Sequence, residues 1–169
     1  MRNLILRAVF LVLPLLLASC NYRLAGTPQP LPFKTIAVEQ VVNDSYAPQA
    51  SNPLMNQLTA MLAQSPALEL VPLDDAQAVL EVTLDDYTKT VLATSERDTA
   101  LARSIGITLK AKCTLKDARS GRTLFKDREV SVTNTVYSND GFLNAEYQNM
   151  TILTRELARR IADQVLGIW

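Results

Sequence analysis

The chain has 169 residues, 48% of them hydrophobic, and its 17 basic and 17 acidic side chains give a formal net charge of +0 at pH 7. This neutral balance gives no electrostatic reason to expect nucleic acid as a partner. The chain contains no histidine, which removes the commonest general base and the commonest metal ligand. Its five glycines are scattered, with no phosphate-binding spacing. We therefore expect no enzyme, no cofactor and no metal.

The N-terminus has the layout of a secretory signal peptide. Two arginines precede an uncharged, leucine-rich stretch, residues 8–19, which is too short for a membrane span because spanning takes roughly 20 residues. The stretch ends in Leu17-Ala18-Ser19-Cys20. This ending resembles the lipobox of bacterial lipoproteins, in which the cysteine is lipidated and becomes the first residue after cleavage. We expect residues 1–19 to be a lipoprotein signal peptide and Cys20 to carry the lipid.

Lipid on Cys20 would hold the processed chain at a membrane surface, because two or three acyl chains together form a stable anchor. Asn21 follows the cysteine, whereas in the best-known sorting scheme an aspartate there retains a lipoprotein in the inner membrane. We therefore expect anchoring at the outer membrane, on the periplasmic side. Alternate prolines in residues 20–32 predict a semi-rigid tether. Processing leaves Cys113 as the one free cysteine, so no intrachain disulfide is expected.

Residues 33–169 are expected to form a single domain that begins with a strand, a helix and a second strand. The segment KTIAVEQVV, residues 34–42, has the composition of a strand. Asn52 followed by Pro53 predicts a capped helix start, and the apolar stripe of that helix ends before Pro66. A short strand is predicted over Leu68–Val71. This order favours a parallel pair of strands joined by a right-handed crossover.

The second half shows strict alternation of apolar and polar residues. Strands are predicted over Leu80–Asp85, over residues 104–116 and over Thr123–Tyr137, because alternation is typical of half-buried strands. The turn over residues 117–122 contains Gly121, which can adopt a positive φ. Residues 144–166 predict a long amphipathic helix. The whole pattern indicates an α+β fold: a single mixed β-sheet of about four to five strands with two α-helices packed on one face.

Basic residues concentrate in the predicted hairpin around this turn. With the turn centred on residues 119 and 120, Thr123 would pair with Lys116. Asp127 would then face Lys112 and Glu129 would face Lys110, and these cross-strand pairs would neutralise both lysines. Lys126 and Arg128 would lie on the other face, opposite small residues, with their charged heads free. Candidate anion contacts are therefore Lys126, Arg128, Arg119 and Arg122. The alternative is that these side chains form an ordinary solvated face.

These segments together resemble the lipopolysaccharide-assembly lipoprotein family, LptE. The likeness begins with CNYRLAG at Cys20, where Asn21 replaces the family's usual glycine, and continues through KTIAVEQVVND, AQAVLEVTLDDY, LKDARSGRTLFKDREVSVTNTVY and LTRELARRIADQVL. The resemblance implies a non-enzymatic subunit of the outer-membrane translocon that transports and assembles lipopolysaccharide. It implies a plug and assembly partner for a large β-barrel protein, with lipopolysaccharide as a possible ligand of basic side chains.

A second hypothesis remains open. The chain could be a free periplasmic lipoprotein that binds a lipid or a glycan between its sheet and its helices, which would require a preformed cavity. Co-purification with a β-barrel would favour the first hypothesis, and a large internal pocket would favour the second. A hydrolase of the cell envelope is the least supported reading, because the sequence offers no recognisable pair of nucleophile and base.

Overall fold

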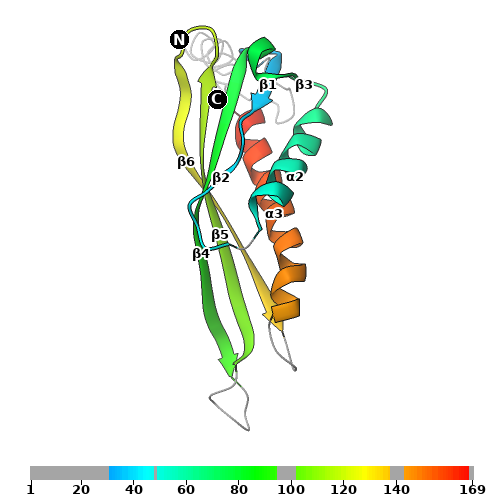
Figure 1. Ribbon diagram of the computed structural model, residues 1–169, viewed down its shortest axis with the longest axis vertical. Coiled ribbons are helices and arrows are strands. Elements are labelled where there is room, and N and C mark those ends of the chain that lie inside the picture. The colour runs from blue at the N-terminus through cyan, green and yellow to red at the C-terminus, as the bar shows by residue number, and fades with distance from the viewer. Residues whose placement is uncertain (1–30, 48, 95–101, 138–142, 168–169) are drawn as a thin grey trace, which may run out of the picture. The chain divides into compact units, whose positions relative to one another are not determined.

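Three long strands form the centre of the fold (Figure 1). They are β4 (Ala78–Thr94), β5 (Ala102–Asp117) and β6 (Thr123–Tyr137), which pair antiparallel in sequence order. The computed structural model describes residues 31–47, 49–94, 102–137 and 143–167. The predicted strands over residues 80–85 and 104–116 are thus longer than expected, whereas the third has its predicted bounds.

Three short strands complete one side of the sheet. They are β1 (Thr35–Val38), β2 (Val42–Asn43) and β3 (Glu69–Leu70). The sheet order is β3-β1-β4-β5-β6, with β2 also paired to β4, and β1 runs parallel to both β3 and β4. The predicted parallel β-α-β unit is therefore confirmed. The strand predicted over residues 34–42 divides into β1 and β2, which brings the sheet to six strands.

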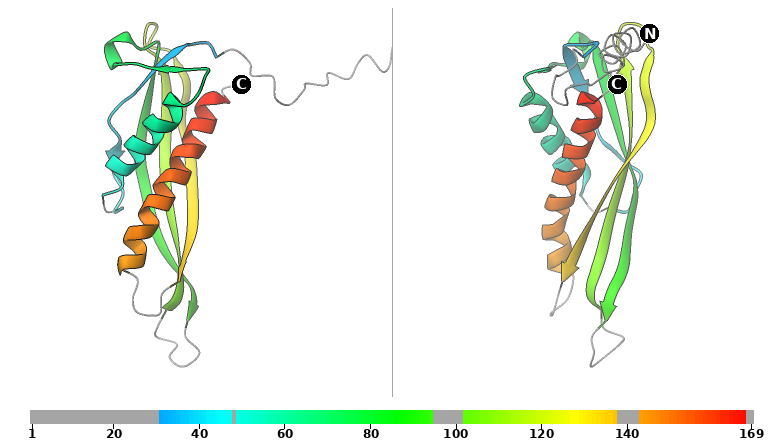
Figure 2. Two further views of the ribbon diagram at one scale, coloured as in Figure 1. Left: turned by 90° about the vertical axis from the view of Figure 1, so that its right-hand side faces the viewer. Right: turned by 180° about the vertical axis from the view of Figure 1, so that it is seen from behind.

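Two helices, α2 (Ser51–Ala63) and α3 (Leu143–Leu166), lie on the same face of the sheet (Figure 2). A short 3-10 helix, η1 (Leu73–Asp75), precedes β4. The predicted helix start was wrong by a few residues: α2 begins before Asn52, and Ala50 occupies the cap position without a side-chain hydrogen bond. None of the helices in the described ranges is long and apolar enough to cross a membrane.

The core fills the layer between the sheet and the helices. Leu54, Leu58 and Leu62 of α2 are fully buried, as are Leu153 and Leu157 of α3. They meet the apolar face of the central strands, whose buried side chains are every second residue from Ala78 to Leu84 and from Ile105 to Leu115. The predicted mixed sheet with two helices on one face is confirmed.

The register of the β5–β6 hairpin differs from the one expected. Lys116 pairs with Thr123 as predicted, but Lys112 pairs with Glu129, and Lys110 pairs with Ser131. Two irregularities in β6 each displace the register by one residue, and the second contains Asp127 with a φ of 47°. A displacement of one residue turns the side chains to the opposite face, and the second displacement turns them back. Residues of β6 after Asp127 therefore lie on the face that was predicted, but each pairs with a residue of β5 two positions away from the predicted partner.

Candidate functional site

The turn between β5 and β6 presents two of the candidate cations. The Asp117 carboxylate accepts hydrogen bonds from the backbone N–H groups of Arg119 at 3.0 Å and Ser120 at 2.8 Å. These bonds hold the pKa of Asp117 below its usual range, chiefly through the Ser120 N–H. Gly121 has a φ of 66°, as its type allows. Arg119 and Arg122 are exposed on this turn.

Lys126 lies beside the turn, at the irregularity in β6. Its side chain is 75% exposed, and its Nζ is 3.9 Å from the nearest Asp127 carboxylate oxygen. At that distance and exposure, the ion pair is weak. The ammonium group is therefore exposed to solvent, but Lys126 does not lie opposite Cys113 as expected, because Arg128 takes that position.

Arg128 has a different environment from the one expected. It pairs with Cys113 on the face that the helices cover. Its Nη1 donates a hydrogen bond to Gln164 of α3 at 2.9 Å, and its guanidinium lies 4.4 Å from the centre of the Phe125 ring. Stacking and hydrogen bonding hold this head group in place. The prediction that the Arg128 guanidinium is free was therefore wrong. Arg128 is only half-buried and bound, whereas Arg119, Arg122 and Lys126 are exposed. Cys20, the predicted lipidation site, lies outside the described residues.

The face of the sheet opposite the helices carries a row of three ion pairs, and the sequence analysis had given two of their lysines, Lys110 and Lys112, acidic partners in the wrong strand. The lysines of β5 bind acids of β4, and the pairs are Lys110–Asp86 at 3.1 Å, Lys112–Asp85 at 2.8 Å and Lys116–Glu81. The Asp85 carboxylate raises the pKa of Lys112. Alternating acids in the strand over residues 80–86 were the available signal. We call the side of the sheet that bears these pairs the open face.

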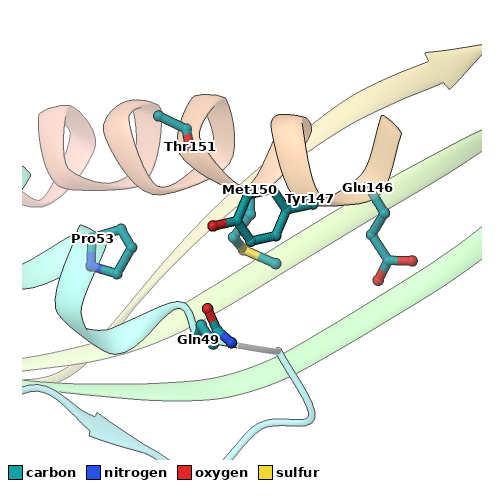
Figure 3. A pocket seen from close by; sticks show the side chains of 6 residues that line it. All are labelled: Gln49, Pro53, Glu146, Tyr147, Met150 and Thr151. Atoms are coloured by element: carbon teal, nitrogen blue, oxygen red, sulfur yellow. The ribbon is translucent and has the colours of Figure 1, made fainter. Parts of the chain in front are cut away.

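A small cavity lies between the N-terminal parts of α2 and α3 (Figure 3). Its volume is about 70 Å³, and its lining is Gln49, Pro53, Glu146, Tyr147, Met150 and Thr151. Ligand sites measure roughly 300–1,000 Å³, so this cavity has room for a few water molecules and not for a lipid or an oligosaccharide. An open groove that shares Gln49 and Pro53 with this cavity has about 530 Å³ and is lined mainly by uncharged polar side chains.

The one carboxylate that lines the small cavity is already bound within the protein. Glu146 accepts a hydrogen bond from the Tyr87 hydroxyl at 2.5 Å, and Lys89 Nζ lies 2.6 Å from its oxygens. Burial and the hydrogen bond to Glu146 raise the pKa of Tyr87 well above its usual range. These three side chains join α3 to β4. They serve packing and orientation, because both carboxylate oxygens are in use.

The comparison with protein families decides what the chain is. A family model described as lipopolysaccharide-assembly, LptE, matches residues 33–166. The chain belongs to this family. The match covers the sheet, both helices and the basic hairpin, and it confirms the resemblance seen in the sequence. No curated protein matches the LptE chain significantly.

Solved structures share the fold of this LptE chain. Lipoprotein B from Nitrosomonas europaea is 17% identical with a TM-score of 0.55, and the match covers 86% of this chain and 88% of that one. A minor lipoprotein from Acinetobacter baumannii is 16% identical with a TM-score of 0.55, covering 81% and 95% of the two chains. A hypothetical protein from Chlamydia trachomatis is 12% identical with a TM-score of 0.60, covering 80% and 97%. At these identities the likeness concerns the fold alone.

Proposed function

We propose that this chain is an outer-membrane lipoprotein subunit of the translocon that transports and assembles lipopolysaccharide, and that it acts as plug and assembly partner of a β-barrel protein. The observation that carries this proposal is membership of the lipopolysaccharide-assembly family over residues 33–166. Its role is one of contact and shape, without catalysis.

The chemistry of the open face supports a plug. Wide membrane barrels have polar interiors, and a subunit inside one needs polar flanks that remain paired when water is displaced. The three ion pairs along β4 and β5 satisfy their own charges, and the Thr108 and Thr133 hydroxyls bind each other at 2.8 Å. Such a face can contact a polar wall with these three pairs already neutralised within the protein.

The anchor belongs to the same proposal. Residues 1–19 act as the lipoprotein signal peptide, Cys20 carries the lipid, residues 20–32 form the tether and residues 33–169 form the domain on the periplasmic side. The names of the Nitrosomonas and Acinetobacter neighbours, both lipoproteins, support this assignment. Mass spectrometry of the processed chain tests it, because an unmodified thiol at Cys20 or an intact leader would overturn it.

Direct contact with lipopolysaccharide is proposed for the exposed cations of the hairpin. Arg119, Arg122 and Lys126 offer free charges to phosphate groups, whereas Arg128 contributes only if its contact with Gln164 opens. Retention of the full chain on immobilised lipopolysaccharide should fall for Lys126→Ala. Arg155→Ala is the matched control, because it removes one exposed cation of α3. Equal retention of the two variants would exclude Lys126 as a contact.

The alternative of a free lipid- or glycan-binding lipoprotein receives less support. Side chains with no exposed surface fill the layer between the sheet and helices, among them Leu80, Ile107, Leu109 and Leu157. The small cavity lies between α2 and α3, the open groove is lined by residues 40–53, and neither is lined by a residue of β4, β5 or β6. The sheet-and-helix core therefore has the tight packing of a structural domain.

Affinity purification from detergent-solubilised membranes tests the proposal. A tagged wild-type chain is expected to retain a β-barrel protein in a constant ratio, as mass spectrometry would measure. A Cys20→Ala chain separates anchoring from assembly, because it lacks the acceptor for lipid while its domain is unchanged. Recovery of the wild-type chain without any barrel, under conditions that keep other outer-membrane complexes intact, would refute the proposed role.

A further inference from the structure

β6 is the last strand of the sheet, and one side of it pairs with no other strand in the described ranges (Figure 1). It is 15 residues long. A long edge strand presents unpaired backbone N–H and C=O groups, which are a template for adding a strand from another molecule. A protein with such an edge needs some means of controlling this pairing.

The direction of the free backbone groups follows from one contact. Arg160 of α3 donates a hydrogen bond from Nη1 to the Ser131 carbonyl at 2.7 Å, so this carbonyl points away from β5. In an antiparallel pair, the N–H and C=O of one residue point to the same side and alternate along the strand. The outward groups are therefore those of Ser131, Thr133 and Thr135. The Thr135 N–H agrees, because it donates to the Asn134 side chain at 3.0 Å.

A second copy of the same chain would match this edge. If two β6 strands paired antiparallel about an axis at Thr133, Ser131 would lie opposite Thr135 of the second copy. The Ser131 carbonyl would then accept the Thr135 N–H across the interface. Glu129 would face Tyr137, so no like charges would oppose each other. Side-chain chemistry along β6 therefore does not prevent self-pairing.

The two backbone groups that would form that intermolecular bond are both occupied within the molecule. Arg160 is held in position by Glu156, which accepts from its Nε at 3.2 Å. Hydrogen bonds from Arg159 and Arg160 lower the pKa of Glu156 to about 2, so this anchor is ionised at neutral pH. Asn134, which covers the Thr135 N–H, donates in turn to Asn149 of α3 at 2.5 Å. Asn149 is only 4% exposed.

We propose that Arg160 and Asn134, both linked to α3, close the β6 edge against a second copy of this chain and so keep the protein monomeric. Self-pairing would compete with the Arg160–Ser131 bond in each copy. A monomer is the form in which one subunit can enter one barrel, but the inference rests on the β6 edge alone and holds whatever the partner.

Arg160→Ala tests this closure, with Arg159→Ala as the matched control. Both arginines are half-exposed and both bind Glu156. Arg159 makes its other ion pair with Asp163 on the same helix, and its recorded hydrogen bonds and ion pairs do not involve β6. Sedimentation velocity of the full chain in detergent measures the dimer dissociation constant. We expect that constant to fall by at least about tenfold for Arg160→Ala, because two charge-assisted hydrogen bonds no longer oppose pairing. Arg159→Ala should behave as the wild type.

A second substitution shows whether the dimer forms through β6. Thr133→Pro, added to Arg160→Ala, removes an outward N–H at the centre of the edge and should restore the monomer, since proline is tolerated on edge strands. A folded Arg160→Ala chain that remains as monomeric as the wild type would overturn the proposal. A dimer that persists with Thr133→Pro would also overturn it, because the contact would then lie elsewhere. If the alanine variant folds poorly, Arg160→Gln repeats the test with a neutral side chain that keeps part of the length of arginine.

Discussion

Replacing Glu146 with alanine removes the contact that joins the first turn of α3 to the far half of β4. The Glu146 side chain is 13% exposed, whereas that of Lys89 is 46% exposed. The ion pair with Lys89 is therefore screened and should contribute at most about 1 kcal/mol. The bond from the Tyr87 hydroxyl is better shielded, and a hydrogen bond to a charged group contributes about 1.5–3 kcal/mol. Together they predict a loss of about 2–3 kcal/mol in the free energy of unfolding.

Thermal unfolding followed by circular dichroism measures this loss. For a domain of this size, 2–3 kcal/mol corresponds to a fall of roughly 4–12 °C in Tm. Glu81→Ala is the control, because it removes an ion pair with Lys116 in which both side chains are about one-third exposed or more, and such pairs contribute roughly 0–1 kcal/mol. If Glu146→Ala were no more destabilising than Glu81→Ala, the assigned role of Glu146 would be wrong.

The same contact has a predicted pH dependence. Burial raises the pKa of Glu146, but the hydrogen bonds from Lys89 and Tyr87 outweigh it and leave the pKa below its ordinary value of 4.5. A carboxyl group whose pKa is lower in the folded state stabilises the fold above its unfolded pKa, and this stabilisation is lost as the pH falls through the folded value. The stability difference between the wild type and Glu146→Gln should thus be constant near neutrality and shrink below about pH 4.5.

Three further predictions concern the core and the turn. Leu157→Ala should lower the free energy of unfolding by about 2–5 kcal/mol, because Leu157 is fully buried. Ile152→Ala, at a half-exposed site of the same helix, should change it by less than about 0.5 kcal/mol, and chemical denaturation measures both values. Burial raises the pKa of the Cys113 thiol to about 12. In a Cys20→Ser chain, a thiol reagent at pH 8 should therefore label Cys113 only after unfolding, and rapid labelling of the folded chain would contradict this. Gly121→Ala should cost about 1 kcal/mol through backbone strain alone, since its φ is 66° and no atom lies within 4 Å of the added Cβ, and an unchanged Tm would show that the turn relaxes.

The sequence was most informative where one face of an element is buried. The alternation in β5 and the stripe along α3 identified those elements to within two residues of their observed bounds. The sequence was least informative where a strand is locally irregular. The strand predicted over residues 34–42 ends at Val38 and resumes at Val42, and no turn residue announces this break. Asp127 adopts a positive φ at a position that reads as regular strand.

The sequence could predict the surroundings of a candidate side chain only where they depend on residues close to it in the chain. The exposure of Lys126 could be predicted from its neighbours in the hairpin. The contacts of Arg128 could not, because Gln164 is 36 residues away in the sequence and its position depends on how α3 packs. The ion pairs of the open face were missed for a similar reason. Lys110 and Lys112 were given acidic partners in β6, but the acids that bind them, Asp86 and Asp85, are in β4, whose register with β5 the sequence alone does not reveal.

The position of β1 determines how the domain would respond to a pull on its leading end. β1 is the first strand after the proposed tether, and it lies between β3 and β4 with both neighbours parallel to it. Tension that pulled Thr35 backward along the strand axis would load the hydrogen bonds on both sides at once in shear, whereas a pull across the axis would break them one after another. A short strand in this slot can therefore resist mechanical force from the membrane better than its four residues would suggest.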